Sequence, residues 1–157
     1  MKERLLEWLI RPEGFYIRRY LKFLRKEERY TLDSPSRLKA YWYKARKNRL
    51  GSRLGFIISA GCFGEGLRID HYGSIIVNPK ARIGKTCLIH GNCCIGNKGG
   101  ESQDSPVIGD NVNIGQNAQI LGGIRIADNV TIAAGAVVVR DVLEVGATVA
   151  GVPAKVL

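Results

Sequence analysis

A large aliphatic residue returns every six positions through most of the C-terminal two thirds of this chain. Two runs keep that spacing: Val77, Ile83, Ile89 and Ile95, then, after one interruption, Ile108, Ile114, Ile120, Ile126, Ile132 and Val138. Four positions after most of these anchors stands a small or β-branched residue: Ala81, Cys87, Cys93, Val112, Ala118, Val130 and Ala136. This six-residue repeat narrows the fold more than any other feature of the sequence.

A period of six argues against a helix with one buried face. Successive residues of an α-helix lie about 100° apart, so six steps place the anchors at several points around the helix. In an extended chain an even spacing keeps residues on one side of a strand. Turn-forming residues fill the positions between anchors, as in Gly109-Asp110-Asn111. The repeat therefore predicts a solenoid of short strands and turns around a narrow aliphatic core.

The pattern resembles that of the hexapeptide-repeat family over roughly residues 54–157, with Gly often following the anchor. The resemblance implies a left-handed parallel β-helix in which three hexapeptides make one coil. Two further segments are similar to acyltransferases of this family: the Gly-rich interruption Gly96-Asn97-Lys98-Gly99-Gly100 and the ending Ala150-Gly151-Val152-Pro153-Ala154-Lys155. We therefore expect a mainly β protein whose β-helix domain, residues 54–157, follows a short α-helical segment, residues 1–53.

The N-terminal segment carries the whole charge excess of the chain. Residues 1–53 hold 16 Lys and Arg against 6 Asp and Glu, a net of +10, whereas residues 54–157 hold eight of each. We expect this basic segment to cap an open end of the solenoid, where unpaired strand edges would otherwise invite association.

Three helices are expected in this cap. The first spans Glu3 to Ile10, and the second runs from about Phe15 to Glu28. Ser34 before Pro35 resembles an N-cap with proline at the first helical position, and Gly51 is expected to end the third helix.

The outer face of the cap, with its Trp and Tyr residues, could dock on an anionic membrane surface or an acidic polymer. Nucleic acid is not expected as a partner, because no nucleic-acid-binding motif accompanies the basic residues. The apolar stretches of the sequence, such as the one that begins at Phe56, are too short for a signal peptide or a membrane span. We expect a cytoplasmic protein, with the inner face of the membrane as an open alternative.

The two histidines are the candidates for acid–base chemistry. Acyl transfer to a hydroxyl needs a base near neutral pH, and histidine suits that role. His71 and His90 stand 19 positions apart, about one coil plus one residue. Coils stack about 4.8 Å apart, so both should lie near one edge and meet a single acceptor. The alternatives are a polar residue finishing the first coil for His71 and a solvent-exposed turn residue for His90.

Asp70-His71, followed by the aliphatic run Ile75-Ile76-Val77, resembles a segment of serine acetyltransferases and of O-acetyltransferases from capsular and exopolysaccharide loci. The resemblance implies that His71 is the base that deprotonates the acceptor hydroxyl for direct attack on acetyl-CoA. It also implies that Asp70 binds the acceptor, and His90 is the third candidate catalytic residue.

The resemblance also implies where acetyl-CoA binds. In this family the cosubstrate lies in a groove between coils, near backbone of the later turns and a basic residue at the C-terminal end. This suggests Gly122, Ala134 and Lys155. No metal site is expected, because the third histidine of the metal-binding relatives is absent. The inward register of Cys87 and Cys93 indicates core thiols.

Two departures from serine acetyltransferases leave the acceptor open between a surface-polysaccharide sugar and L-serine. Asp104-Ser105-Pro106 aligns with their Arg-His-Pro, and Phe56-Ile57-Ile58-Ser59 occupies the place of the aspartate that orients their base. The interruption, about residues 97–106, is expected to fold over the active site, or to be a tolerated insertion.

Two functions follow from these observations. The first is an acetyl-CoA-dependent O-acetyltransferase, built as a homotrimer with sites between subunits, as the family is. The alternative is a non-catalytic hexapeptide-repeat protein that binds a partner, membrane or acidic polymer through its basic helices.

Overall fold

The computed structural model describes residues 12–33, 36–99 and 104–157. Two helices come first, α2 (Glu13–Glu28) and α3 (Arg37–Leu54), joined through a π-helical turn, η1 (Arg29–Asp33). The helix predicted for Glu3–Ile10 and the predicted cap Ser34-Pro35 lie outside the described residues.

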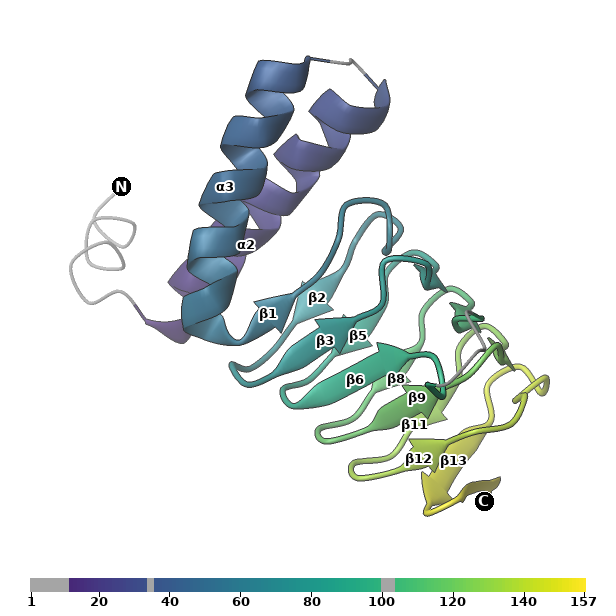
Figure 1. The fold of residues 1–157 in the computed structure, drawn as a ribbon. Coiled ribbons are helices and arrows are strands. Elements are labelled where there is room, and N and C mark those ends of the chain that lie inside the picture. The colour runs from purple at the N-terminus through teal and green to yellow at the C-terminus, as the bar shows by residue number, and fades with distance from the viewer. Residues whose placement is uncertain (1–11, 34–35, 100–103) are drawn as a thin grey trace.

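Short strands follow the helices through the rest of the chain (Figure 1). Their bounds are β1 Phe56–Ile57, β2 Arg68–Ile69, β3 Ile75–Val77, β4 Arg82–Ile83, β5 Leu88–Ile89, β6 Cys93–Gly96, β7 Val107–Ile108, β8 Asn113–Ile114, β9 Gln119–Leu121, β10 Arg125–Ile126, β11 Thr131–Ile132, β12 Val137–Val138, β13 Thr148–Gly151 and β14 Ala154–Val156.

The strands form three sheets, and each full coil gives one strand to each. Sheet A has the order β1-β3-β6-β9-β12, sheet B β10-β7-β4, and sheet C β14-β13-β11-β8-β5-β2. Neighbouring strands are parallel and about one coil apart in sequence, so that Ile76 pairs with Cys94. β14 alone among these pairs runs antiparallel, against β13. The chain therefore winds through sheets A, B and C in turn, and Figure 1 shows the strands of sheet A stacked from β1 to β12.

The repeat predicted from the sequence is confirmed by burial. Every anchor from Val77 to Val138 and every small residue of the second layer is buried, with relative exposures between 0% and 4%. The side chains between these buried residues point outward, as in β3, where Ile76 is exposed between two buried neighbours. One narrow aliphatic core thus runs along the axis of the coils, and the hydrophobic effect acts on each coil alike.

The turns between sheets use residues that tolerate left-handed backbone. Asn92, Asn111, Asn117 and Asn129 have φ between 56° and 62°, a region that asparagine enters more readily than most residues. The three kinds of turn are called here the A–B, B–C and C–A corners, after the sheets that they join. Turns of one kind stack on one another along the β-helix.

The two helices pack over the N-terminal coil (Figure 1). Ile17, Tyr20 and Leu24 of α2 are buried in the same core cluster as the first strands, and the Tyr20 ring meets Phe56 edge-on at 5.2 Å. Polar contacts add to this packing: Arg25 Nη1 donates a hydrogen bond of 3.0 Å to the Phe63 carbonyl. We refer to α2, η1 and α3 together as the helical hairpin.

The prediction that Gly51 ends the third helix is wrong. α3 continues to Leu54, and the left-handed residue that closes it is Gly55, at φ 82°. Gly51 instead lets the helix approach the first strand closely. A Cβ at that position would lie 2.5 Å from the Phe56 carbonyl oxygen and 3.1 Å from the Tyr20 ring.

All four cysteines lie in the described part of the chain and are free thiols. Cys87 and Cys93 are buried, as their register predicts, and burial raises the pKa of both thiols. Among the described residues, no group of three or more His, Cys, Asp or Glu side chains is placed to hold a metal ion. None of the described helices is both long and apolar enough to cross a membrane.

Candidate active site

The two histidines meet at the C–A corner, where the chain leaves sheet C for sheet A. His71 follows β2 and His90 follows β5, and these strands are parallel neighbours in sheet C. The two imidazole rings are 6.2 Å apart between centroids and inclined by 34°. The 19-residue spacing therefore places them on adjacent coils, close enough for one small acceptor to contact both rings.

Close stacking of backbone makes this pairing geometrically possible. The turn that follows His90 packs against the turn that follows His71, and a Cβ on Gly91 would clash with the Tyr72 carbonyl oxygen. Only glycine allows that approach. The side chain of Asn92 then accepts a hydrogen bond of 2.9 Å from the Ser74 amide, which ties the two turns together.

Both histidines reach solvent, as residues that handle a substrate must. His71 has 62% of its side chain exposed, whereas His90 is half-buried. Asp70 is also half-buried, and its Oδ1 lies 3.9 Å from Arg68 Nη2, an exposed and solvent-screened ion pair. The three residues predicted for catalysis therefore lie on one corner, although their roles remain predictions.

A carboxylate from the helical hairpin completes this corner. Glu13, the first residue of α2, places Oε2 at 3.6 Å from His71 Nδ1. Its Oε1 accepts a hydrogen bond from the Tyr72 amide, and the Tyr72 hydroxyl donates to the Glu13 carbonyl oxygen at 3.1 Å. Burial, followed by the nearby Glu13 charge, raises the pKa of the Tyr72 hydroxyl, so the phenol remains a donor at neutral pH.

Sequence reasoning missed Glu13. It lies 58 positions before His71 and outside the repeat, so no spacing links the two residues. The one available signal was its place after Pro12, where an acidic residue in a first helical turn is favoured by the helix dipole. That signal predicts a helix start and says nothing of what the carboxylate meets.

The residues predicted to contact acetyl-CoA do not lie together in one chain. Ala134 is exposed at the C–A corner, in the turn between β11 and β12 that stacks beyond the histidines. Gly122 is buried at the A–B corner, after β9. Lys155 is exposed in β14, opposite Ala150 at the C-terminal end of the β-helix. Sheet A therefore separates Gly122 from Ala134 and from the histidines.

The interruption also belongs to the A–B corner, because it joins β6 of sheet A to β7 of sheet B. Its described residues fold back along later turns: Lys98 covers Gly122, where a Cβ would meet the lysine Cε at 2.8 Å. Lys98 Nζ donates a 3.2 Å hydrogen bond to the Val139 carbonyl oxygen. The predicted closure over the histidines is therefore not formed within the chain by these described residues.

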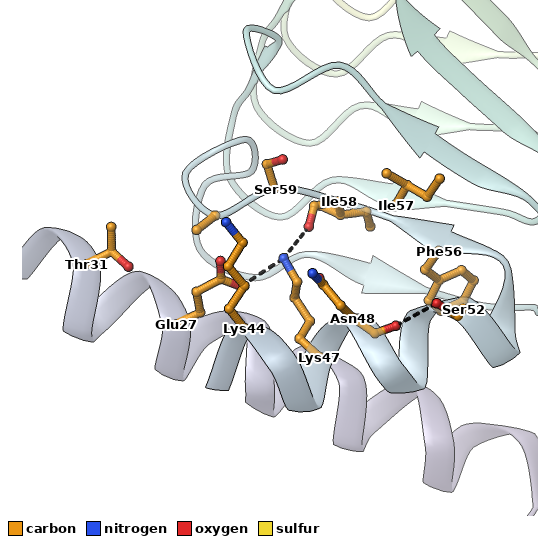
Figure 2. A pocket seen from close by; sticks show the side chains of 11 residues that line it. Glu27, Thr31, Lys44, Lys47, Asn48, Ser52, Phe56, Ile57, Ile58 and Ser59 are labelled. Atoms are coloured by element: carbon orange, nitrogen blue, oxygen red, sulfur yellow. Dashed lines mark hydrogen bonds and ion pairs between the residues drawn. The ribbon is translucent and has the colours of Figure 1, made fainter. Parts of the chain in front are cut away.

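A cleft of about 520 Å³ lies elsewhere, between the helical hairpin and β1 (Figure 2). The Lys47 ammonium projects between the hairpin and the first strand, 2.8 Å from Glu27 Oε2 and 2.6 Å from the Ile58 carbonyl oxygen. The Lys47 ammonium is thus paired with the Glu27 carboxylate and the Ile58 carbonyl, so we assign the cleft a structural role.

Comparisons with known proteins agree with this fold. Residues 105–140 match the family model described as bacterial transferase hexapeptide (six repeats). A serine acetyltransferase of Synechococcus elongatus is 39% identical over 95 residues, which cover 60% of this chain and 38% of that protein. A serine acetyltransferase of Buchnera aphidicola is 30% identical over 132 residues, which cover 77% of this chain and 50% of that protein.

Solved structures give the same answer. The serine acetyltransferase of Neisseria gonorrhoeae is similar with a TM-score of 0.71 and 36% identity, over 88% of this chain and 53% of that one. The same enzyme in complex with serine gives a TM-score of 0.66 and 37% identity, over 87% of this chain and 54% of that one. The apoenzyme of soybean serine acetyltransferase is similar with a TM-score of 0.74 and 28% identity, over 88% of this chain and 56% of that one.

The fold is a left-handed parallel β-helix, similar to that of the solved serine acetyltransferases, and part of its repeat matches the hexapeptide transferase model. The predicted resemblance to hexapeptide acyltransferases of the serine acetyltransferase kind is confirmed. The chain spans between 38% and 55% of the length of the curated relatives compared with it.

Proposed function

We propose that this chain is an acetyl-CoA-dependent O-acetyltransferase that acetylates L-serine, with His71 as its general base. One observation carries the proposal: two histidine rings 6.2 Å apart at an open corner, in a β-helix similar to serine acetyltransferases. Histidine is the side chain most often used as a general base toward a hydroxyl at neutral pH.

The proposed reaction is a single displacement. The unprotonated Nε2 of His71 removes the hydroxyl proton while the hydroxyl oxygen attacks the thioester carbonyl carbon. A C–O bond forms, the C–S bond of acetyl-CoA breaks, and the imidazolium returns its proton to the leaving CoA thiolate. Asp70 is proposed to bind the acceptor, since a carboxylate suits the ammonium group of serine, and His90 to donate a hydrogen bond to it.

The relatives favour L-serine over a sugar as acceptor. They are serine acetyltransferases, and one of the similar structures holds serine. The sugar hydroxyl predicted from the sequence stays an outcome of the test below, because Asp104-Ser105-Pro106 replaces the histidine-containing loop that the resemblance leads us to expect.

We infer a homotrimer whose sites lie between subunits. Acetyl-CoA could contact both Gly122 and Ala134, and the interruption could cover the histidines, only if the A–B corner of one chain met the C–A corner of another. Sheet A, between these corners, carries two outward isoleucines on paired strands, Ile57 and Ile76, exposed by 62% and 44%. Sedimentation of wild type and Ile76→Lys tests the assembly: trimer for wild type and monomer for the variant are expected, and a monomeric wild type contradicts it.

We also propose a cytoplasmic protein that contacts the inner membrane face through α3. Leu38, Tyr41 and Trp42 are exposed on adjacent turns of this helix, by 86%, 69% and 49%, and Arg46 lies 4.4 Å from the Trp42 ring centre. Aromatic and basic side chains on one face suit an anionic lipid surface. We expect the protein to cosediment with anionic vesicles at low salt, and we expect high salt or Trp42→Ala to abolish this binding. No binding at low salt would contradict the proposed membrane contact.

Measuring CoA release from acetyl-CoA, with L-serine and a panel of free and nucleotide-linked sugars, tests the activity. Chromatographic detection avoids interference from the four protein thiols. His71→Ala should lower kcat by about 10²- to 10⁴-fold, while Lys85→Ala, at an exposed B–C corner, should match wild type. Turnover with a sugar alone would replace serine as acceptor, and no turnover or acetyl-CoA binding would leave a non-catalytic binding protein.

A further inference from the structure

The helical hairpin delivers one carboxylate to the histidine corner. Glu13 stands at the start of α2, where the positive end of the helix dipole stabilises its charge. One carboxylate oxygen is held by the Tyr72 amide, the residue directly after His71. The other oxygen lies 3.6 Å from His71 Nδ1, so the carboxylate is fixed from one side and faces the imidazole with the other.

A catalytic imidazole needs one tautomer. If His71 Nε2 is to accept a proton, the hydrogen must sit on Nδ1, and a carboxylate acceptor at Nδ1 favours that arrangement. A neutral imidazole in water prefers the opposite tautomer, so an unassisted histidine is a weaker base. The first strand does not supply this acceptor, because hydrophobic Phe56, Ile57 and Ile58 precede the turn.

We propose that Glu13 is the positioning residue for His71, accepting its Nδ1 hydrogen and leaving Nε2 for the acceptor hydroxyl. The proposal rests on the function proposed above and adds to it that the helical hairpin supplies part of the active site. The separation of 3.6 Å is slightly longer than a hydrogen bond, and catalytic hydrogen bonds often tighten only when substrate binds.

Other charged or titratable groups at this corner are poorly suited to the role. Asp70 precedes His71 and lies 3.9 Å from Arg68, on the outward side of the strand. His90 is a second imidazole and carries no fixed negative charge. The Tyr72 hydroxyl is committed as a donor to the Glu13 carbonyl. Glu13 thus has a negative charge, lies close to His71 Nδ1, and is held in place by a second contact with Tyr72.

The test uses Glu13→Gln, which keeps an oxygen acceptor for the Tyr72 amide and removes the charge. ¹⁵N NMR of the imidazole nitrogens at high pH reports the His71 tautomer without any need for activity. Wild type should have the hydrogen mainly on Nδ1, and Glu13→Gln should shift the population toward Nε2. The kcat with the best acceptor should fall about 10- to 100-fold, with KM little changed.

Two control variants separate positioning from docking of the helix. Tyr72→Phe removes the hydroxyl bond to the α2 backbone and leaves the Glu13 carboxylate, so it should keep the wild-type tautomer. Glu65→Gln removes an exposed carboxylate from another corner and should change neither readout. An unchanged His71 tautomer in Glu13→Gln overturns the proposal whatever the activity. A shifted tautomer in a protein that turns over no acceptor supports the Glu13 contact and rejects the proposed function instead.

Discussion

The β-helix and the helical hairpin are stabilised in different ways, although they share one core. In the β-helix each coil repeats the same interaction: an aliphatic anchor and a small residue, both buried, stacked on their equivalents in the next coil. In the hairpin most side chains are polar or charged, and α2 buries only Ile17, Tyr20, Leu24 and Glu27. The buried residues of the β-helix can therefore be predicted from each hexapeptide alone. Those of the hairpin depend on where it packs against the first coil.

Docking of the hairpin uses buried polar contacts that the β-helix does not need. Lys47 and Glu27 form an ion pair whose side chains are 4% and 7% exposed. A buried pair of this kind adds little over an apolar pair of the same size, but it penalises any arrangement that leaves one charge alone. The contrast teaches that the β-helix is stabilised by repetition and the hairpin by a few specific contacts.

The largest loss of stability is expected from breaking the hairpin's ion pair. Lys47→Ala leaves the Glu27 carboxylate buried without a partner and should lower the free energy of unfolding by about 4 kcal/mol. Urea denaturation measures it. The double variant Lys47→Met/Glu27→Leu should recover most of the loss, and a double variant as unstable as the single one would contradict this reading.

Within the β-helix, a buried anchor should matter more for stability than an outward residue. Ile120 is fully buried, so Ile120→Ala should lower the free energy of unfolding by about 3 kcal/mol through lost burial and the cavity left behind. Val107 of β7 points outward from sheet B and is 51% exposed, so Val107→Ala should lower it by less than about 1 kcal/mol. Chemical denaturation at a concentration that keeps one assembly state compares the two, and equal losses would refute the inward register.

The close approach of α3 to β1 gives a smaller effect. Gly51→Ala places a methyl group 2.5 Å from the Phe56 carbonyl and should destabilise by about 2 kcal/mol, because the helix must move outward. Gly14→Ala is the matched control, since its Cβ meets only the flexible end of Arg18 and alanine favours a helix. Thermal unfolding should separate them; equal melting temperatures would return Gly51 to an ordinary helical position.

The smallest effect concerns the core thiols and pH. Burial raises the pKa of Cys87 in the folded state above its ordinary value of 9.0, so the unfolded chain loses this proton first. The resulting stability is complete below about pH 9 and is lost as pH rises further. Alanine already occupies the equivalent inward position at Ala81 and Ala118. Cys87→Ala should therefore lower the free energy of unfolding by about 1 kcal/mol or less. Urea midpoints at pH 7 and pH 10 should differ less in the variant than in wild type.

The sequence predicted the β-helix and its inward register well, because every coil repeats one local rule. The pairing of His71 with His90 followed from the same rule, since residues about one coil apart must stack. Gly51 was misread because a helix-breaking propensity was outweighed by packing against Phe56. The burial of Lys47 could not be predicted from the sequence, because it depends on contacts with Glu27 and Ile58 that only the packed hairpin brings together.

Glu13 could not be predicted for the same physical reason. Its distance to His71 is set by the angle at which α2 crosses the first coil, through contacts such as Tyr20 with Phe56 and Arg25 with Phe63. No periodicity carries that angle. The candidate site thus combines histidines of the β-helix with a carboxylate of the helical hairpin, and the two regions meet between Glu13 and His71.

A double-mutant cycle on kcat is the most direct test of whether Glu13 acts through His71. Wild type, Glu13→Gln, His71→Ala and the double variant would be compared with the best acceptor at saturating acetyl-CoA. If the carboxylate acts through the imidazole, the double variant should be no slower than His71→Ala, because Glu13 then has nothing left to position. Losses that multiply, so that the double variant is slower by the full Glu13→Gln factor, would contradict a shared site built from the hairpin and the β-helix.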